Sequence, residues 1–414
     1  MSNQINLFEP LINSLFEVGK VIARLVRGDK FDFVEYFKII EFCNNQGVYP
    51  KLIKEYKGLK GDVYLFSIPT GLGLKEFEKQ KGGIVAALGI DIDIRLVGKY
   101  IEIEVITNTV PTKIDYRLQD RIKDSICISF AQSLEGQVYL DLKETPHTLC
   151  TGTTGGGKSV TTRNIITSII NLYPNEVDLH LIDFKVVELS IFKKLEQTRS
   201  YVNELEEAKE IIADRLEECK RRYNLFDELG VTNIYDYNKK VSHDKKLKFE
   251  FIVIEEFVML LEDKKKIAMI NLKKLASLSR ASGQFLYITA QRFDNTIIDL
   301  VLRSVIGNRI CHLVESENDS KLIIDITGAE KLRGNGHILF KNGSKVTECQ
   351  SYFITDNQIR DYTKKYINHN KQYEPIEANV SDFKKLNDKV IEEVKEAKEN
   401  RNNKVIDLSF IDNL

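Results

Sequence analysis

The chain contains the stretch Gly152-Thr153-Thr154-Gly155-Gly156-Gly157-Lys158-Ser159, which fits the pattern G-x-x-x-x-G-K-S. Glycines at these positions let consecutive backbone N–H groups turn inward around a phosphate group. An apolar stretch at residues 148–150 precedes the pattern, and a helical pattern follows from Val160. A strand, a glycine-rich loop and a helix in this order predict a nucleotide-binding P-loop rather than a simple glycine-rich turn.

The pattern assigns a role to each of its residues. Lys158 is expected to reach the β- and γ-phosphates of ATP, and Ser159 is expected to ligate Mg²⁺. The helix that begins near Val160 adds its N-terminal dipole to the phosphate site. The predicted nucleotide contacts are therefore Gly152, Thr153, Thr154, Gly155, Gly156, Gly157, Lys158, Ser159 and Val160.

Two carboxylates follow a second apolar strand, because residues 251–254 run directly into Glu255-Glu256. Carboxylates at the carboxyl edge of such a sheet lie beside the P-loop. We expect Glu255 to hold Mg²⁺ through water and Glu256 to polarise the attacking water. Gln291 follows the predicted strand 285–289, where it is placed to contact the γ-phosphate or that water. The alternatives are a solvated strand end for the carboxylates and an ordinary surface glutamine for Gln291.

Outward from the P-loop, uniformly apolar strands alternate with helices, which predicts an α/β fold with a parallel central sheet covered on both faces. A long helix is predicted from Glu204 to Leu229, ending at Gly230. Residues 337–341 and 345–353 flank Asn342-Gly343 and predict a hairpin with a tight turn. The predicted strands are Thr148–Cys150, Leu179–Ile182, Phe251–Ile254, Phe285–Thr289 and Ile310–Val314.

The pattern divides the chain into four parts. Residues 1–58 have few turn signals and are predicted to be helical. Residues 59–112 contain a predicted helix at Leu74 to Leu88 and two stretches of period-two alternation, which predict a small α+β domain. Residues 113–363 hold the P-loop ATPase domain, and residues 364–414 form a charged helical or disordered tail.

Composition limits the function classes. The chain has 60 Lys and Arg against 61 Asp and Glu, so any basic surface for a nucleic acid must be local. Six scattered cysteines without a C-x-x-C pair suggest neither zinc nor disulfides, which fits a reducing cytoplasm. No stretch approaches 18 apolar residues, so no integral membrane span is expected. Residues 11–26 have the apolar spacing of an amphipathic helix, which either packs on its own domain or recruits the protein to a membrane surface.

Seven ordered motifs across residues 126–356 resemble those of the FtsK/SpoIIIE family of DNA translocases. The resemblance is greater to plasmid and conjugative-element members, the TcpA-like coupling ATPases, than to cell-division members. Tyr64-Leu65-Phe66 and Pro69-Thr70-Gly71 support that closer resemblance. Besides the P-loop, the motifs are Pro146–Leu149, Leu181–Lys185 with Val187–Ser190, Glu218–Tyr223, Arg280–Gly283, Thr289–Arg292 and Gly328–Leu332.

This resemblance implies a RecA-like fold that assembles as a hexameric ring around double-stranded DNA, with ATP at the interface between subunits. Arg280 matches a position whose side chain reaches a neighbour's nucleotide, and Arg309 is a weaker candidate for that role; an arginine at a helix end can also simply cap carbonyl groups. Loops facing the ring channel would bind DNA through Lys185, Lys264, Lys265 and Lys266, although single lysines are usually just solvated. A relaxase or a membrane transfer channel are the implied partners.

Departures from the family keep other readings open. Glu255-Glu256 stands where the family usually has Asp-Glu, which puts the mode of Mg²⁺ binding in question and leaves a non-hydrolysing nucleotide-binding scaffold as one alternative. The other alternative is a protein-translocating ATPase of the type VII secretion kind. Membrane spans and the winged-helix domain typical of the family are missing from the sequence. We therefore expect a cytoplasmic transfer or coupling motor of a plasmid or integrative element rather than a chromosome-segregation motor.

Overall fold

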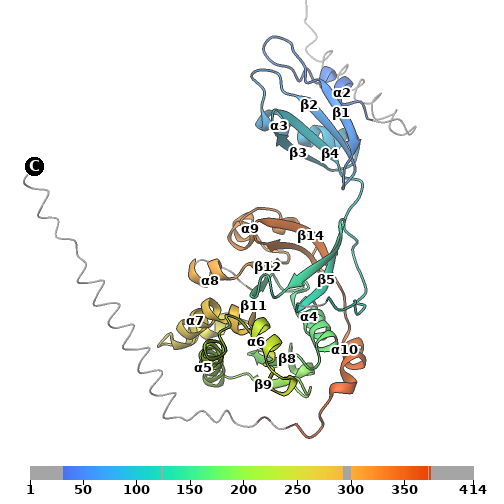
Figure 1. The fold of residues 1–414 in the computed structure, drawn as a ribbon. Coiled ribbons are helices and arrows are strands. Elements are labelled where there is room, and N and C mark those ends of the chain that lie inside the picture. The colour runs from blue at the N-terminus through green and yellow to red at the C-terminus, as the bar shows by residue number, and fades with distance from the viewer. Residues whose placement is uncertain (1–30, 123–124, 292–299, 372, 374–414) are drawn as a thin grey trace, which may run out of the picture. The chain divides into compact units, whose positions relative to one another are not determined.

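The computed structural model describes residues 31–122, 125–291, 300–371 and 373. The chain divides into two compact units, Met1–Val110 and Pro111–Leu414, and each is described by itself (Figure 1). This boundary falls two residues before the one expected at residue 112. The amphipathic pattern at residues 11–26 and the tail beyond residue 373 lie outside the described residues. Within the described residues, no helix has the length and apolar character needed to cross a membrane.

The first unit packs two helices on a four-stranded antiparallel sheet of order β1-β2-β4-β3. Its core is aromatic: Phe37, Phe66 and Phe77 are fully buried. Its elements are α2 (Phe33–Ile39), β1 (Leu52–Lys57), β2 (Asp62–Ser67), α3 (Leu74–Leu88), β3 (Ile92–Val97) and β4 (Tyr100–Val105).

The strand β1 corrects the prediction that residues 1–58 are helical. Every residue of β1 is exposed, and the strand lies at the edge of the sheet, where it pairs only with β2. A strand with no buried face carries no period-two alternation of apolar and polar residues. Its sequence therefore held no signal that distinguishes a strand from a helix.

The second unit is built on one ten-stranded sheet of order β6-β5-β14-β13-β12-β7-β11-β10-β8-β9. The six strands from β12 to β9 run parallel, and the remaining pairs are antiparallel. This confirms the predicted α/β fold. The strands are β5 (Cys127–Ser133), β6 (Gly136–Asp141), β7 (Thr148–Thr151), β8 (Val177–Asp183), β9 (Thr198–Val202), β10 (Phe249–Glu255), β11 (Gln284–Ala290), β12 (Asn308–Cys311), β13 (His337–Asn342) and β14 (Lys345–Ser351).

Helices cover both faces of this sheet, and α5 and α7 lie side by side (Figure 1). The α-helices are α4 (Lys158–Leu172), α5 (Leu205–Leu229), α6 (Ile234–Lys240), α7 (Ile267–Ser282), α8 (Leu300–Val305), α9 (Glu317–Ile324) and α10 (Asp356–Thr363). Short 3-10 helices occupy Ser190–Phe192, His243–Lys245, Phe257–Glu262, Ala329–Lys331 and Lys364–Tyr366.

Strand β10 shows why the central strands are uniformly apolar. Phe251 and Val253 pack in the core cluster that contains α4, whereas Ile252 and Ile254 pack in the cluster that contains α5 and α7. Successive side chains of a strand point to opposite faces, so a strand covered on both faces needs an apolar residue at every position. This burial is the physical basis of the pattern that predicted the sheet.

The strand order brings four loops to the carboxyl edge of the parallel strands. The P-loop follows β7, Gln291 follows β11, Glu256 follows β10 and Lys185 follows β8. Because β11 lies between β7 and β10, the P-loop and the two carboxylates are separated by one strand. The candidate site lies at this edge.

A buried charge network ties α5 to the sheet at the opposite edge. The guanidinium group of Arg222, which is 3% exposed, donates to Glu218, to Glu250 and to the carbonyl oxygens of Lys248 and Ser282. Burial raises the pKa of Glu218, but hydrogen bonds from Arg221 and Arg222 outweigh it and hold that pKa at about 2. The arginine pair within the Glu218–Tyr223 motif therefore divides into one buried structural residue and one exposed residue.

We expect Arg222→Met to lower the free energy of unfolding by about 3 kcal/mol. The substitution removes a positive charge from beside the buried Glu250 carboxylate and leaves the carbonyl oxygens of Lys248 and Ser282 without this hydrogen-bond donor. Arg221→Met is the matched control, and its effect should stay below about 1 kcal/mol because that side chain is largely exposed. Urea denaturation of both variants measures the difference. Equal effects of the two substitutions would contradict a structural role specific to Arg222.

Candidate functional site

The glycine-rich loop connects β7 to α4 and is held from behind by two other segments. The N–H of Thr153 donates to the carbonyl of Leu313 at 2.9 Å, and the N–H of Gly336 donates to the carbonyl of Gly156 at 2.8 Å. Helix α4 begins at Lys158, with Gly157 as its N-cap residue. The first turn of a helix has backbone N–H groups without helical partners, and these are available to an anion.

Two of the glycines are required by close packing. A Cβ atom on Gly157 would lie 2.5 Å from the backbone nitrogen of Gly336, and one on Gly152 would lie 2.4 Å from Cβ of His312. Both glycines also have positive φ angles, 106° and 153°, which side-chain-bearing residues rarely adopt. The loop therefore needs glycine at both positions for shape as well as for access to phosphate.

His312, which no sequence motif indicates, supports the P-loop. Burial lowers its pKa to about 4, and the charge of Lys158 acts in the same direction, so the imidazole is neutral near pH 7. Its Nδ1 lies 2.9 Å from the carbonyl oxygen of Gly156. A neutral imidazole can satisfy this acceptor only with Nδ1–H as the donor. His312 therefore holds the centre of the P-loop through a hydrogen bond to the carbonyl oxygen of Gly156.

Lys158 and Glu255 form a buried ion pair, with side chains that are 6% and 1% exposed. Thr289, on the intervening strand β11, joins the pair: its hydroxyl donates to Glu255 Oε2 at 2.7 Å and accepts from Lys158 Nζ at 3.2 Å. The same oxygen accepts the backbone N–H of Glu256 at 3.0 Å. The structure thus brings together Lys158 and both predicted carboxylates, and adds Thr289, which had been noted only as part of a motif.

Glu256 lies in a different environment from Glu255. Its backbone is left-handed, with φ 58°, and its carboxylate pairs with Lys185, whose Nζ is 2.9 Å from Oε2. The other carboxylate oxygen accepts the N–H of Gln291 at 3.3 Å. Lys185, predicted to bind DNA, is therefore engaged with the predicted catalytic carboxylate in this structure. The two residues lie 71 positions apart in the chain, so no local sequence pattern indicates the pair.

The loop that carries Lys185 is fixed by Asp183 at the end of β8. The buried Asp183 carboxylate accepts the backbone N–H of Leu189 at 2.9 Å and the hydroxyl of Tyr201 at 3.3 Å. Lys185 is therefore presented by a closed loop. Val187, in the same loop, is 65% exposed.

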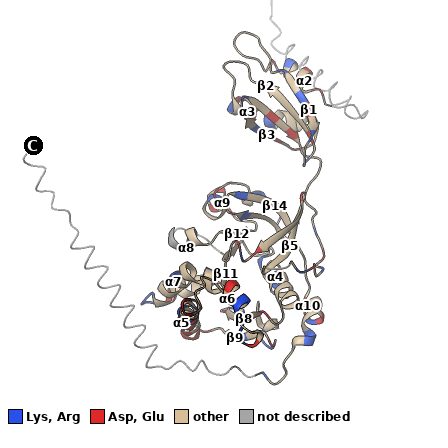
Figure 2. Cartoon of the chain, in the orientation of Figure 1, with Lys and Arg blue, Asp and Glu red and all other residues tan. Residues whose placement is uncertain are grey.

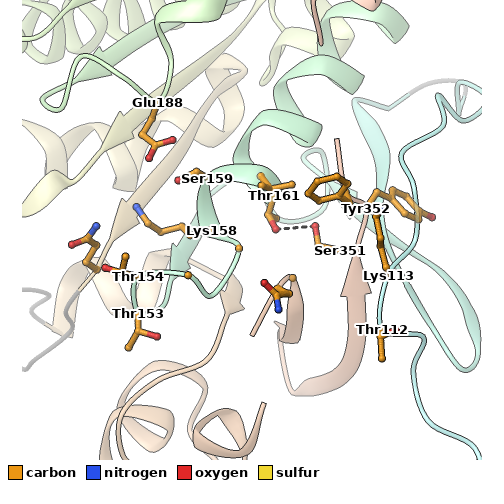
Figure 3. Close-up of a pocket in the computed structure, with 17 residues that line it drawn as sticks. Thr112, Lys113, Thr153, Thr154, Lys158, Ser159, Thr161, Glu188, Ser351 and Tyr352 are labelled. Carbon is orange, nitrogen blue, oxygen red and sulfur yellow. Dashed lines mark hydrogen bonds between the residues drawn. The ribbon is translucent and has the colours of Figure 1, made fainter. Parts of the chain in front are cut away.

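A cavity of about 650 Å³ extends from the P-loop. Figure 3 shows Thr153, Thr154, Lys158 and Ser159 at one end, Thr112, Lys113 and Tyr352 at the other, and the Thr161–Ser351 hydrogen bond between them. This volume is within the range of ligand pockets, roughly 300 to 1,000 Å³. The predicted nucleotide contacts Thr153, Thr154, Gly155, Gly157, Lys158, Ser159 and Val160 all line it, as does Gln291.

The residues at this site suit Mg²⁺ bound together with phosphate groups. Ser159 and Glu255 supply oxygen atoms, the donor type that Mg²⁺ prefers, and such sites use few protein ligands plus substrate phosphates. Within the described part of the chain, no group of three or more His, Cys, Asp and Glu side chains could hold a metal by itself. Lys158 engages one oxygen of Glu255 and Thr289 engages the other, so turning Lys158 toward a phosphate would leave the first oxygen more accessible to the metal.

The remaining predicted residues lie away from the cavity. Arg280 is exposed in the last turn of α7, and Lys264, Lys265 and Lys266 are exposed in the turn before α7. Arg309, the weaker candidate for reaching a neighbour's nucleotide, is only 9% exposed. Its guanidinium group donates to Asp325 and to the carbonyls of Arg303 and Ile323. A guanidinium group whose hydrogen bonds are taken up within its own chain in this way has a structural role.

Known proteins resemble this chain both in sequence and in fold. The profile of the FtsK/SpoIIIE family matches residues 114–333. The DNA translocase FtsK of Caldanaerobacter subterraneus subsp. tengcongensis is 30% identical over 360 residues, which cover 82% of this chain and 50% of that protein. The DNA translocase SpoIIIE of Bacillus subtilis is 30% identical over 310 residues, which cover 70% of this chain and 39% of that protein. The chain thus spans half or less of the length of these two relatives.

Solved structures of other proteins share the fold. The pCW3 conjugation coupling protein TcpA, in a monomer form with ATPγS, has a TM-score of 0.60 at 23% identity, covering 80% of this chain and 98% of that one. The cytoplasmic domain of the type VII secretion ATPase EccC of Thermomonospora curvata has a TM-score of 0.52 at 20% identity, covering 65% of this chain and 34% of that one. Both likenesses concern the architecture alone.

Proposed function

We propose, since the chain belongs to the FtsK/SpoIIIE family, that it is an ATPase that uses ATP and Mg²⁺ to translocate double-stranded DNA. The observation that carries this proposal is the convergence of Lys158, Glu255 and Glu256 at one edge of the sheet, beside a cavity of nucleotide size. The finer proposal is a hexameric coupling motor of a plasmid or integrative element. Such a motor would work with a relaxase or a membrane transfer channel.

In this mechanism the residues of the site have separate tasks. Lys158 leaves Glu255 to bind the β- and γ-phosphates, and Ser159 and the freed Glu255 oxygen are then available to Mg²⁺, which would neutralise charge on the phosphates. Glu256 orients and deprotonates the attacking water, and Gln291 lies beside it. The proposal therefore requires the buried ion pair to exchange one partner for another.

The test of Glu256 is its replacement by glutamine, which keeps the shape and removes the base. We expect Glu256→Gln to bind ATP normally and to lose turnover by about a hundredfold or more, the usual scale for a general base. Glu262→Gln, an exposed carboxylate six residues later, is the control and should retain wild-type turnover. Near-normal hydrolysis by Glu256→Gln would move the role to another residue, with Glu255 the first to test.

The ion pair between Lys185 and Glu256 suggests how DNA could control hydrolysis. A general base held by an ammonium group is not free to orient water, and Lys185 is one-third exposed on the loop pinned by Asp183. DNA phosphates compete for the same ammonium group. We therefore assign Lys185 two alternating partners, Glu256 without DNA and a phosphate with DNA. The lysines before α7 contact DNA without this link.

Lys185→Ala separates these two roles. It should raise ATPase activity without DNA severalfold and reduce the stimulation by duplex DNA, because Glu256 is already free.

The variant with Lys264, Lys265 and Lys266 all changed to Ala should keep its basal rate, bind unrelated sequences more weakly, and lose up to about three units of salt slope. ATPase assays with and without duplex DNA, and binding titrations at several salt concentrations, measure both.

Three outcomes would count against this scheme. A basal rate that falls in Lys185→Ala would show that Lys185 holds Glu256 in its active position instead. A wild-type ATPase that ignores duplex DNA would favour the alternative of a protein-translocating ATPase, and the absence of any hydrolysis would favour a nucleotide-binding scaffold.

The position of Arg280 favours a role between subunits. Helix α7 leads through Gly283 into β11, so Arg280 lies near the amino end of that strand, whereas Gln291 follows its carboxyl end. A seven-residue strand spans about 20 Å. An exposed arginine this far from the P-loop of its own subunit serves a nucleotide only across an interface, as a hexameric ring would provide.

Mixing experiments test this assignment. Arg280→Ala subunits and Lys158→Ala subunits should each be inactive alone, and mixed rings should recover part of the ATPase activity, because some interfaces then pair an intact P-loop with an intact Arg280. The measurement is ATPase rate against mixing ratio, with mixed assembly checked by differently tagged subunits. Mixed rings without recovery at any ratio would remove Arg280 from the site.

A further inference from the structure

We propose that the end of the cavity remote from the P-loop binds the base of a purine nucleotide, with Phe353 as its stacking surface and Lys113 as a hydrogen-bond donor at the edge of the base. This inference rests on the proposed function only in requiring that the P-loop binds the phosphates of a nucleotide. None of the residues predicted from the sequence, and none of those used in the mechanism above, lies in this part of the cavity.

The orientation of the ligand follows from its phosphate end. Lys158 and Ser159 fix the terminal phosphates at one end of the cavity, so the nucleoside must occupy the other end (Figure 3). Between the two ends lie Thr161 and Ser351, whose hydroxyl groups are hydrogen-bonded at 2.8 Å. This pair marks the level of the sugar. The cavity beyond it is lined by Thr112, Lys113, Tyr352 and Phe353.

Phe353 is exposed where its neighbours are buried. It is 38% exposed, whereas Tyr352 and Ile354 on either side are each 3% exposed. Tyr352 points into the core, where its hydroxyl group lies 2.9 Å from that of Ser129. Adjacent residues of an extended segment point to opposite sides, so Phe353 is directed out of the core and lines the cavity. A ring in this position offers an aromatic surface to a planar base.

The backbone holds this ring in place. The N–H of Phe353 donates to the carbonyl of Ile114, and the N–H of Tyr116 donates to the carbonyl of Phe353, both at 2.8 Å. Phe353 is thereby locked to the segment that carries Thr112 and Lys113. A stacking surface held by backbone hydrogen bonds on both sides loses little conformational freedom when a ligand binds.

Lys113 brings a charged donor to the same place. Its Nζ lies 4.8 Å from the centre of the Phe353 ring and 3.0 Å from Oδ1 of Asp115. The side chains of Lys113 and Asp115 are 60% and 67% exposed, and an ion pair this exposed is weak enough for the ammonium group to exchange Asp115 for a ligand. Purine rings carry nitrogen acceptors on their edges. The ammonium group lies over the face of the Phe353 ring, so a base that stacks on this face would displace it toward the edge of the base, where these acceptors lie.

The test compares ATP with inorganic tripolyphosphate, which has the phosphates but no base. Calorimetric titration of the full chain should show that Phe353→Ala loses about tenfold or more in ATP affinity and nothing in tripolyphosphate affinity, the scale expected when one base loses its aromatic stacking partner. Phe353→Tyr should restore ATP binding. Tyr139→Ala, which removes another exposed aromatic ring from β6 outside the cavity, is the control and should bind both ligands normally.

Lys113→Met should weaken ATP severalfold and leave tripolyphosphate unchanged; unchanged ATP binding would remove Lys113 from the subsite. Unchanged ATP affinity in Phe353→Ala, or an equal loss for both ligands, would overturn the base subsite while leaving the phosphate site intact. A wild-type chain that binds neither ligand would overturn the proposed function and the subsite with it.

Discussion

The buried ion pair between Lys158 and Glu255 is the interaction on which the rest of the site depends. Two charges removed from water cost several kcal/mol each unless they compensate one another and their hydrogen bonds are satisfied. Here the compensation comes from the pair itself and from the Thr289 hydroxyl, which contacts both partners and the backbone of Glu256. A nucleotide that draws Lys158 away from Glu255 must therefore offer the ammonium group a stronger anion.

This arrangement depends in turn on the order of the strands. Lys158 follows β7 and Glu255 ends β10, while β11 lies between them and contributes Thr289. In the register of these strands, Ile254 of β10 pairs with Ile288 of β11, and Ala290 of β11 pairs with Thr151 of β7. His312 and Gly336 close the P-loop from behind through the carbonyl oxygen of Gly156. Hydrogen bonds from two other segments thus hold the P-loop in shape, as a preorganised site requires.

A partly exposed basic side chain, that of Lys185, lies beside this site. Lys185 lies on the loop after β8 and pairs with Glu256, and its side chain is 33% exposed. The near-zero net charge of the chain makes such local charges more important, because no bulk positive field draws DNA to the protein. Figure 2 shows acidic and basic residues interspersed along both units. Control of hydrolysis by DNA would therefore rest on a few positions rather than on the whole surface.

The sequence by itself determined the P-loop, the carboxylates after β10, the long helix α5 and the hairpin of β13 and β14. These features depend on local patterns: glycine spacing, apolar runs and turn residues. It did not reveal β5, β6 or β9; β9 is an edge strand with one buried residue, and in β6 buried positions are few.

Only the tertiary structure decided which charged residues meet. Lys185 pairs with Glu256 across 71 positions of sequence, Phe353 meets Lys113 across 240, and Arg309 is hydrogen-bonded to Asp325 within its own chain. Each of these contacts joins residues brought together by the strand order or by loops that return from distant parts of the chain. Periodicity describes what one segment buries, whereas the partner of a charge depends on which other segment the fold places beside it.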